Sequence, residues 1–544
     1  MATSNAIEIY DVTPRDGDQA DGINLSFEDK MAIALIAERM GFPYVEGGFP
    51  QSNAVDRRVF EALRERPLKG TKHAAFGMTR RAGIAANEDA GLRALVDSGA
   101  PAITVVGKSS RYQVENVLRT TVEENIAMIR DSVAFLRVHS DDVTYDAEHF
   151  FDAWKEDRAY AIHTLRAAQE TGARRLVLCD TNGGSIPGLV AKAVRDVRKE
   201  FSDIIIGIHP HDDRDLAMAN MLAAVDEGAT HVQGTWNGHG ERVGNLDLAV
   251  AIPNLDSEGY KTISSDALAS LTSTAHEVAR IQRQRMDPRQ AFVGKRVARH
   301  KGGMHISAVG RTQNEDGNGK NAYEFFDPSR YGNEGAFVAS KQGGAAFIAQ
   351  FTGEARLLRR DQRDRLRSEK PLQGKIMEKI KAIESLGFSI ARGPASLELL
   401  MLKSMEDAPR PFTVIERPKI YDAVGADADA TVKILSRGDE VVSHTVGAGK
   451  GTVNAMFLAL IKGLQGKFPD VRNVSVVDFD VEKLQGSDQS SASAVQVAIQ
   501  FFDGDEQWAT TSASEDMLEA SWNAIVDGLE WKILRMEAKR RVEI

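Results

Sequence analysis

The segment from residue 175 to residue 213, RLVLCDTNGGSIPGLVAKAVRDVRKEFSDIIIGIHPHDD, contains the pattern that decides the fold. Two short apolar runs, residues 175–180 and 204–209, flank a stretch whose apolar residues recur at helical spacing. A short apolar run indicates a buried strand, and a helix between two such strands is typical of a parallel strand–helix–strand unit. The segment therefore predicts two neighbouring parallel strands joined by a helical crossover.

The same unit repeats through the first half of the chain. We expect eight strands, each followed by a helical stretch, at residues 7–11, 44–48, 73–76, 102–107, 143–146, 175–180, 204–209 and 231–236. Eight consecutive units suit an α/β fold of the closed (β/α)8 TIM-barrel type. A doubly wound open sheet is the structural alternative, but the Gly-x-Gly-x-x-Gly turn of a dinucleotide site does not follow the first strand.

The composition is that of a soluble globular protein with more than one domain, with 544 residues, 42% hydrophobic and 27% charged. The net charge of -10 argues against a nucleic-acid partner. The sequence has no run of about 18 apolar residues, so we expect no membrane-spanning helix. Cys179 is the only cysteine, which excludes an internal disulfide and fits a reducing, cytoplasmic compartment.

Two further regions follow the barrel, and we place the domain boundaries at 1–280, 281–410 and 411–544. The middle region combines a Gly- and Asn-rich loop with charged helical stretches, which indicates a mostly helical linker. The last region alternates strand-like runs with two amphipathic helices, which predicts a compact α+β domain. We expect its strands at 429–436, 440–447, 471–482 and 494–502, and its helices at 452–468 and 515–534.

Polar residues gather where the barrel strands end, which is where functional residues of a parallel barrel lie. Each has an ordinary explanation by itself, such as a surface ion pair for Arg15 or a helix cap for Thr181. Their occurrence at the ends of different strands is what indicates one active site. They are Arg15 and Asp16 after the first strand, Glu46 in the second, Glu148 after the fifth, Asp180 and Thr181 at the sixth, His209 and His211 at the seventh, and Asn245 after the eighth.

His209 and His211 are the strongest indication of a metal site. Residues two apart on a strand point to the same side, so both imidazoles can face the barrel mouth. Taken alone, such a pair is more often hydrogen-bonded than metal-bound, but Asp16 supplies a carboxylate at another strand end. Imidazole with carboxylate suits Zn, Mn, Co or Fe, and three protein ligands with open positions are typical of a catalytic metal. Asn245 can add a fourth oxygen ligand.

The chain resembles a known family in segments that span nearly its whole length. It is similar to the citramalate synthase branch of the 2-isopropylmalate/homocitrate synthase family, which belongs to the DRE-TIM metallolyases. The segments RDGDQ, HPHDD and GHGERVGN are highly specific for that family, and YDAEHFFDAWK with LCDTNGG is specific for the branch. The C-terminal segments GKGTVNAMFLALIKGL and SASEDMLEASWNAIVDGLEWKIL resemble the regulatory domain of the same family, called LeuA-type.

The resemblance implies roles for individual residues. Asp16, His209 and His211 match the ligands of a divalent metal ion (Mn, Mg, Zn or Co), and Asn245 matches the asparagine beside it. Arg15, Asp180 and Thr181 match positions that bind the 2-oxo acid. The catalytic set comprises Arg15, Glu46 and Glu148 of the barrel, together with His305 and Tyr323, which the family inserts into the neighbouring subunit's site.

The resemblance also implies a reaction and partners. The reaction is a Claisen-type condensation of acetyl-CoA with pyruvate and water to citramalate and CoA, a route toward isoleucine. The implied assembly is a homodimer, and isoleucine or leucine is the implied effector of the last domain. The alternatives are the same chemistry on another 2-oxo acid, a lyase of the hydroxymethylglutaryl-CoA type, or a non-catalytic metal sensor. A sensor needs metal ligands but no acid–base residues, so Arg15, Glu46 and Glu148 argue against it.

Overall fold

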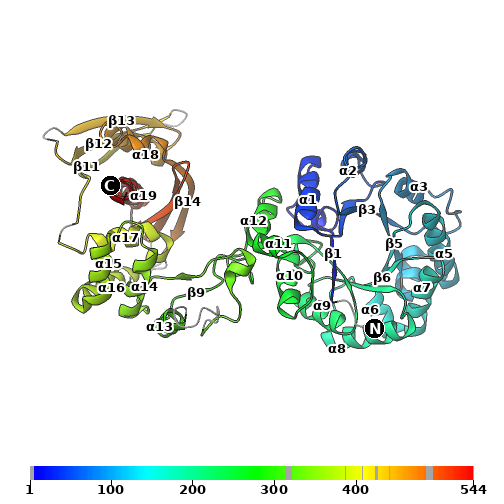
Figure 1. The fold of residues 1–544 in the computed structure, drawn as a ribbon. Helices are drawn as coiled ribbons and strands as arrows, with labels where there is room; N and C mark the ends of the chain where they lie inside the picture. The colour runs from blue at the N-terminus through cyan, green and yellow to red at the C-terminus, as the bar shows by residue number, and fades with distance from the viewer. Residues whose placement is uncertain are drawn as a thin grey trace. The chain divides into compact units, whose positions relative to one another are not determined.

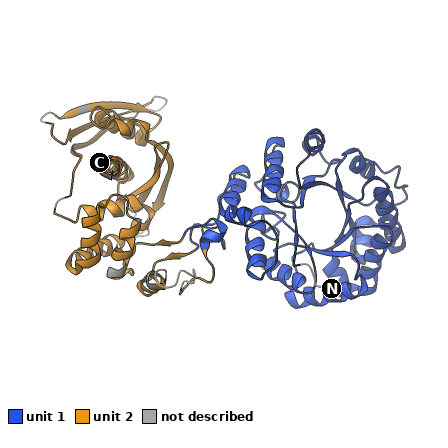
Figure 2. Ribbon diagram, in the orientation of Figure 1, with its two compact units in different colours: residues 1–297, 328–334 blue, residues 298–327, 335–544 orange. Residues whose placement is uncertain are grey.

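A computed structural model describes residues 5–312, 322–385, 387–406, 408–422, 427–439, 442–484 and 494–542. The chain forms two compact units, which are coloured separately in Figure 2. Unit 1 comprises residues 1–297 and 328–334, and unit 2 comprises residues 298–327 and 335–544. The three domain boundaries drawn from the sequence remain a prediction.

Unit 1 is a closed barrel of eight parallel strands with helices around it (Figure 1). Each strand pairs with the next, and β8 closes the ring on β1, with Glu8 opposite His231. Closure excludes the open sheet and confirms the predicted TIM barrel. The strands are β1 (Glu8–Asp11), β2 (Tyr44–Gly48), β3 (Lys72–Met78), β4 (Ala102–Lys108), β5 (Val143–Glu148), β6 (Arg175–Asp180), β7 (Ile205–Pro210) and β8 (His231–Gly234).

The barrel helices begin and end at residues whose local chemistry favours a cap. At the start of α1, the Ser26 side chain accepts from the Asp29 N–H and the Asp29 carboxylate accepts from the Ser26 N–H, which is a capping box. The helix ends at Gly41, whose φ of 72° favours glycine. The principal helices are α1 (Phe27–Met40), α2 (Ala54–Glu65), α3 (Ala90–Asp97), α5 (Val122–His139), α6 (Phe150–Glu156), α7 (Arg158–Glu170), α8 (Pro187–Glu200), α9 (Ala217–Asp226), α10 (Leu248–Ser257) and α12 (Leu271–Ile281).

A charged cluster occupies the amino ends of the barrel strands. Arg175 is 1% exposed, and its guanidinium forms ion pairs with Glu8 and Asp142. The guanidinium also lies 4.5 Å from the centre of the Tyr44 ring. His231 Nδ1 lies 3.2 Å from Glu8 Oε2. Since these groups lie at the end of the barrel that does not hold active sites in this fold, we assign the cluster to stability.

The Glu8 carboxylate makes the stability of the barrel depend on pH. Burial alone would raise its pKa, but hydrogen bonds from His231 and Arg175 outweigh burial and lower the pKa from 4.5 to about 2. Because the pKa is lower in the folded state, Glu8 stabilises the fold above about pH 4.5, and this contribution is lost as the pH falls toward 2.

We therefore expect Glu8→Gln to lower the free energy of unfolding by about 1–2 kcal/mol at pH 7. The difference from wild type should shrink steadily between pH 5 and pH 3. Urea unfolding midpoints measured across this range test the expectation, with the exposed Glu65→Gln as the matched control. A difference that does not change with pH would contradict the assigned role of the carboxylate.

Unit 2 contains a group of helices and two small antiparallel sheets. Each sheet is followed by one helix, so the order of three strands and a helix occurs twice. The predicted α+β domain is confirmed. The helices before it are α13 (Gly303–Thr312), α14 (Gly344–Glu354), α15 (Arg360–Ser368), α16 (Lys370–Ser385) and α17 (Pro394–Leu402). The repeats are β11 (Phe412–Tyr421), β12 (Ala428–Ser436), β13 (Ser443–Gly449) with α18 (Thr452–Leu464), and β14 (Ser475–Lys483), β15 (Val495–Phe502), β16 (Gln507–Ser514) with α19 (Met517–Val542).

The sequence analysis missed β11 and β16. Residues 440 and 441, where it began a strand, lie outside the described residues. Within the described part of the chain, no helix is long and apolar enough to cross a membrane.

Candidate active site

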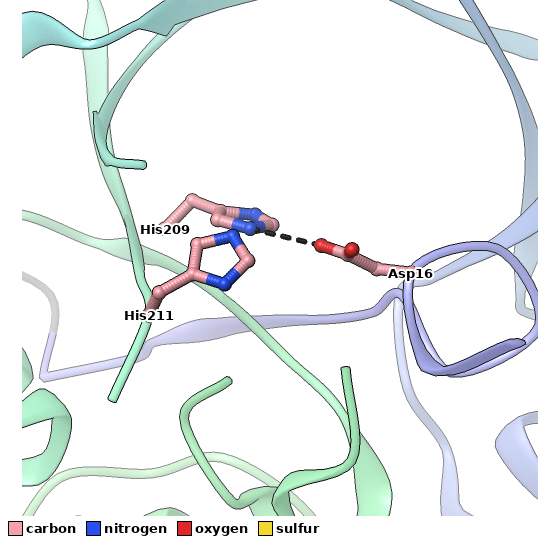
Figure 3. A group of neighbouring side chains, drawn as sticks. All are labelled: Asp16, His209 and His211. Carbon is pink, nitrogen blue, oxygen red and sulfur yellow. Dashed lines mark ion pairs between the residues drawn. The ribbon is translucent and has the colours of Figure 1, made fainter. Parts of the chain in front are cut away.

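Three potential metal ligands meet at the carboxyl ends of β1 and β7 (Figure 3). Asp16 lies in the turn after β1, where its N–H donates to the Val12 carbonyl at 2.8 Å. His209 is in β7, and His211 directly follows that strand. Asp16 Oδ2 lies 3.1 Å from His209 Nε2, and one ligand atom from each of the three residues lies within 4.8 Å of the others. Among the described residues, no other group of three His, Cys, Asp or Glu side chains brings its ligand atoms this close together.

Asn245 joins this cluster because its backbone is bridged to that of His211. Its amide Nδ2 lies 2.9 Å from Asp16 Oδ2 and 3.2 Å from His209 Nε2. The asparagine predicted to lie beside the metal is therefore in contact with two of the three predicted ligands.

The charges of the cluster favour a cation. Burial would raise the pKa of Asp16, but Arg15 and His209 lower it well below its ordinary value. Burial, with the neighbouring His209, lowers the pKa of His211 to about 4. His211 is therefore neutral at pH 7 and has a lone pair available for a ligand. Asp16 is then an anionic ligand beside a neutral imidazole.

The residues fit a divalent metal ion. His211 Nδ1 and Asn245 Oδ1 are buried polar atoms that have no hydrogen-bond partner in the described structure. A buried polar group without a partner costs free energy, so such atoms at one site indicate a missing ligand. A rotation of the Asn245 amide by 180° would turn Oδ1 toward Asp16 and His209, where a metal would lie.

Arg15 is held beside the metal-ligand cluster by a buried carboxylate. Its Nε donates to Glu46 Oε2, and its Nη1 lies 3.5 Å from Asp16 Oδ2. Glu46 is 0% exposed and also accepts a hydrogen bond of 3.0 Å from the Tyr10 hydroxyl. The guanidinium carbon lies 4.0 Å from the centre of the Phe76 ring. These contacts fix a positive charge next to the ligands, where it can stabilise a developing oxyanion.

A second group of polar residues lies at the ends of β4, β5 and β6. Glu148 is the last residue of β5 rather than a loop residue, and its Oε2 lies 2.5 Å from Lys108 Nζ. Thr181 Oγ1 accepts a hydrogen bond of 2.8 Å from the N–H of His149. The Asp180 carboxylate accepts from the Ser185 N–H and hydroxyl within its own loop. Asp180 is thus engaged in shaping the loop, while Glu148 ends β5 and Thr181 directly follows the neighbouring strand β6.

His305 and Tyr323 belong to unit 2. Their rings stack with centroids 3.9 Å apart and an angle of 17° between their planes. Both are exposed. The structure thus brings these two predicted residues together with each other, and their role in a neighbouring subunit's site remains a prediction.

Two interior residues near the cluster were missed by the sequence analysis. Gln233 on β8 lies with its Oε1 2.7 Å from His209 Nδ1, and its Nε2 lies 3.2 Å from Asp146 Oδ1 on β5. Burial raises the pKa of Asp146 to about 7. The pattern His231-x-Gln233 in a core strand was the available indication, because polar residues two apart in such a strand point into the barrel together.

Comparison with known proteins matches both halves of the chain to established families. The HMGL-like family matches residues 6–278, which is the barrel. The LeuA allosteric (dimerisation) domain matches residues 393–533, which cover both repeats of unit 2 except the end of α19.

Curated relatives match the chain over nearly its full length. The (R)-citramalate synthase of Synechocystis is 36% identical over 98% of this chain and 97% of its own. The (R)-citramalate synthase of Aquifex aeolicus is 35% identical over 98% of each chain. A 2-isopropylmalate synthase of Listeria innocua is 30% identical, over 60% of this chain and 62% of its own. The chain therefore belongs to the HMGL-like family and, within it, to the family of the (R)-citramalate synthases.

Proposed function

We propose that this protein is an acetyl-CoA-dependent acyltransferase that condenses acetyl-CoA with pyruvate and water to citramalate and CoA. The similarity to (R)-citramalate synthases over 98% of the chain carries the proposal. The similarity to the 2-isopropylmalate synthase covers only 60% of the chain, so it gives weaker support to the alternative of a 2-isopropylmalate synthase. The ion pair of Arg15 with Glu46, beside the ligands, supports an enzyme over a metal sensor.

Asp16, His209 and His211 would hold the divalent ion, with Asn245 as a further oxygen ligand. A bound ion supplies Lewis acidity to the keto group of the 2-oxo acid. Arg15 would stabilise the negative charge that develops on the keto oxygen, since Glu46 already holds its guanidinium in place. Thr181, directly after β6, is the proposed contact for the carboxylate end of the acceptor, and Asp180 is proposed to support it by shaping the same loop.

The acetyl-CoA methyl group must lose a proton before it attacks the keto carbon. Glu148 is the proposed barrel residue in this transfer, and its contact with Lys108 Nζ holds the carboxylate in place. His305 and Tyr323 are proposed to complete the relay from the neighbouring subunit. Their stacking within unit 2 supports delivery as a pair.

The match to a LeuA allosteric (dimerisation) domain supports a homodimer and a regulatory role for unit 2. We propose isoleucine or leucine as the effector. Such an effector acts only through different affinities for the active and inactive states. The proposed location is the cytoplasm.

CoA-thiol release from acetyl-CoA tests the function. We expect release with pyruvate and Mn2+ or Mg2+, and a loss of at least about tenfold with 2-oxoisovalerate or 2-oxoglutarate in its place, because a pocket closed around a methyl group excludes larger side chains. A chelator should abolish release, and added Mn2+ should restore it.

Two other outcomes would support a different function. Chelator-sensitive release with a bulkier 2-oxo acid alone would keep the mechanism and overturn the substrate. Absence of release with all three acids, in protein that still binds Mn2+, would favour the metal sensor.

A further inference from the structure

A chain of polar side chains runs through the barrel interior to the metal-ligand cluster. His231 Nδ1 lies 3.2 Å from Glu8 Oε2, and His231 Nε2 lies 3.4 Å from Gln233 Nε2. The Gln233 amide also lies 3.2 Å from Asp146 Oδ1 and 2.7 Å from His209 Nδ1. His231 and Gln233 are 0% exposed, Asp146 is 2% exposed and His209 is 5% exposed. Water therefore has little access to these groups, and their polar atoms must form hydrogen bonds with one another.

The carboxylates at the two ends of this network set its direction. The Glu8 carboxylate accepts, so His231 carries its proton on Nδ1 and presents a lone pair on Nε2. The Gln233 Nε2 has two hydrogens and faces two acceptors, Asp146 Oδ1 and His231 Nε2. Both contacts orient the amide in the same way, with its nitrogen toward Asp146 and its oxygen toward His209.

The orientation of the amide decides which nitrogen of His209 is free. Gln233 Oε1 can only accept, so His209 Nδ1 must donate to it. When the ring is neutral, its lone pair is then on Nε2, the atom that lies 3.1 Å from Asp16 Oδ2. Only the unprotonated nitrogen of an imidazole can bind a metal, and its partner nitrogen commonly donates to an acceptor that fixes the ring.

We propose that Gln233 is a positioning residue for His209, holding its ring so that Nε2 faces the metal. This inference rests on the proposed metal-binding role of Asp16, His209 and His211. Asp146 and His231 act one step further away, by preventing the Gln233 amide from turning over. If residue 233 had only a structural role, it would need only to fill the space in the barrel interior and to form hydrogen bonds with its neighbours.

The test compares two replacements of Gln233 that separate shape from hydrogen bonding. Gln233→Met keeps the length of the side chain and removes the acceptor. Gln233→Glu is made together with Asp146→Asn, so that an amide and not a second carboxylate faces the new side chain, and it keeps an acceptor for His209. The affinity for Mn2+ is measured at pH 8 from the electron paramagnetic resonance of the free ion, in the full-length protein. Gln496→Met is the matched control, because Gln496 is 1% exposed and hydrogen-bonded to Ser389 and Thr511 in unit 2.

We expect Gln233→Met to raise the dissociation constant of Mn2+ by about 10- to 100-fold. Gln233→Glu with Asp146→Asn should stay within about threefold of wild type or bind more tightly, and Gln496→Met should bind as wild type does. The absorption spectrum of the Co2+-loaded protein should change in Gln233→Met alone, because the His209 ring is no longer held.

Three results would overturn the proposal. Wild-type affinity in Gln233→Met would show that His209 needs no acceptor. An equal loss of Mn2+ affinity in both Gln233 variants would show that residue 233 contributes by packing. If the Met variant does not fold, the Mn2+ affinity of the Glu variant alone tests the proposal. A wild-type protein that binds no Mn2+ would remove the metal site itself, which distinguishes failure of the proposed function from failure of this inference.

Discussion

Replacement of Asp16 by Asn should reduce kcat for CoA release by about 10³-fold, with Mn2+ held at a concentration that saturates the wild type. Asp16 is the one anionic member of the ligand cluster, and it lies 3.1 Å from His209 and 3.5 Å from Arg15. A neutral amide binds a divalent ion less well and removes one of the two carboxylates that pair with Arg15. A loss of about 4 kcal/mol of Lewis-acid stabilisation corresponds to three factors of ten in rate.

The measurement pairs the rate with a Mn2+ titration. The dissociation constant of Mn2+ should rise together with the loss of rate, and excess metal should recover part of the activity. Asp21→Asn, an exposed carboxylate in the following loop, is the control and should behave as wild type. An Asp16→Asn protein that binds Mn2+ normally would show that Asp16 is not a ligand.

Replacement of Arg15 by Lys should reduce kcat by about 10²- to 10³-fold with little change in the affinity for Mn2+. The ammonium keeps the positive charge but loses the planar geometry with which the guanidinium contacts Glu46 and lies over Phe76. The developing charge on the keto oxygen then lacks a fixed partner. This separation of rate from metal affinity distinguishes Arg15 from the ligands.

Arg80→Lys is the matched control for this experiment. Arg80 is 5% exposed and forms ion pairs with Glu124 and Asp131, outside the proposed site. Its replacement should lower the unfolding midpoint but leave kcat unchanged. If Arg15→Lys also kept its kcat, the proposed stabilisation of the oxyanion would be wrong.

The barrel could be predicted because its strands are buried on both faces. Residues of β6 are all buried, so the strand appears in the sequence as one apolar run with a polar end. The last domain was harder to predict, because its strands are half exposed. β11 places Glu416, Arg417 and Lys419 among its exposed or part-exposed residues, and β16 consists largely of small polar residues. Their strand pairing is decided by neighbours in the sheet and not by local pattern.

Some residues of the candidate site could likewise be predicted from the sequence, and others could not. His209 and His211 could be predicted from their spacing, and Asp16 from its place after a strand. The contact between Gln233 and Asp146 could not, because the two residues are 87 positions apart and meet only when the barrel closes around them. Asn245 was proposed from its place after the eighth strand, and its bridge to His211 supplies the physical reason for its position.

The charged cluster around Arg175 has a consequence for how this protein can evolve. Because these ion pairs lie at the amino ends of the strands, the loops at the opposite end are not needed to close the barrel. A substitution at the carboxyl ends of the strands, where the acceptor is proposed to bind, therefore does not remove these stabilising contacts. Such a barrel can give rise to descendants that accept different 2-oxo acids while the architecture stays the same.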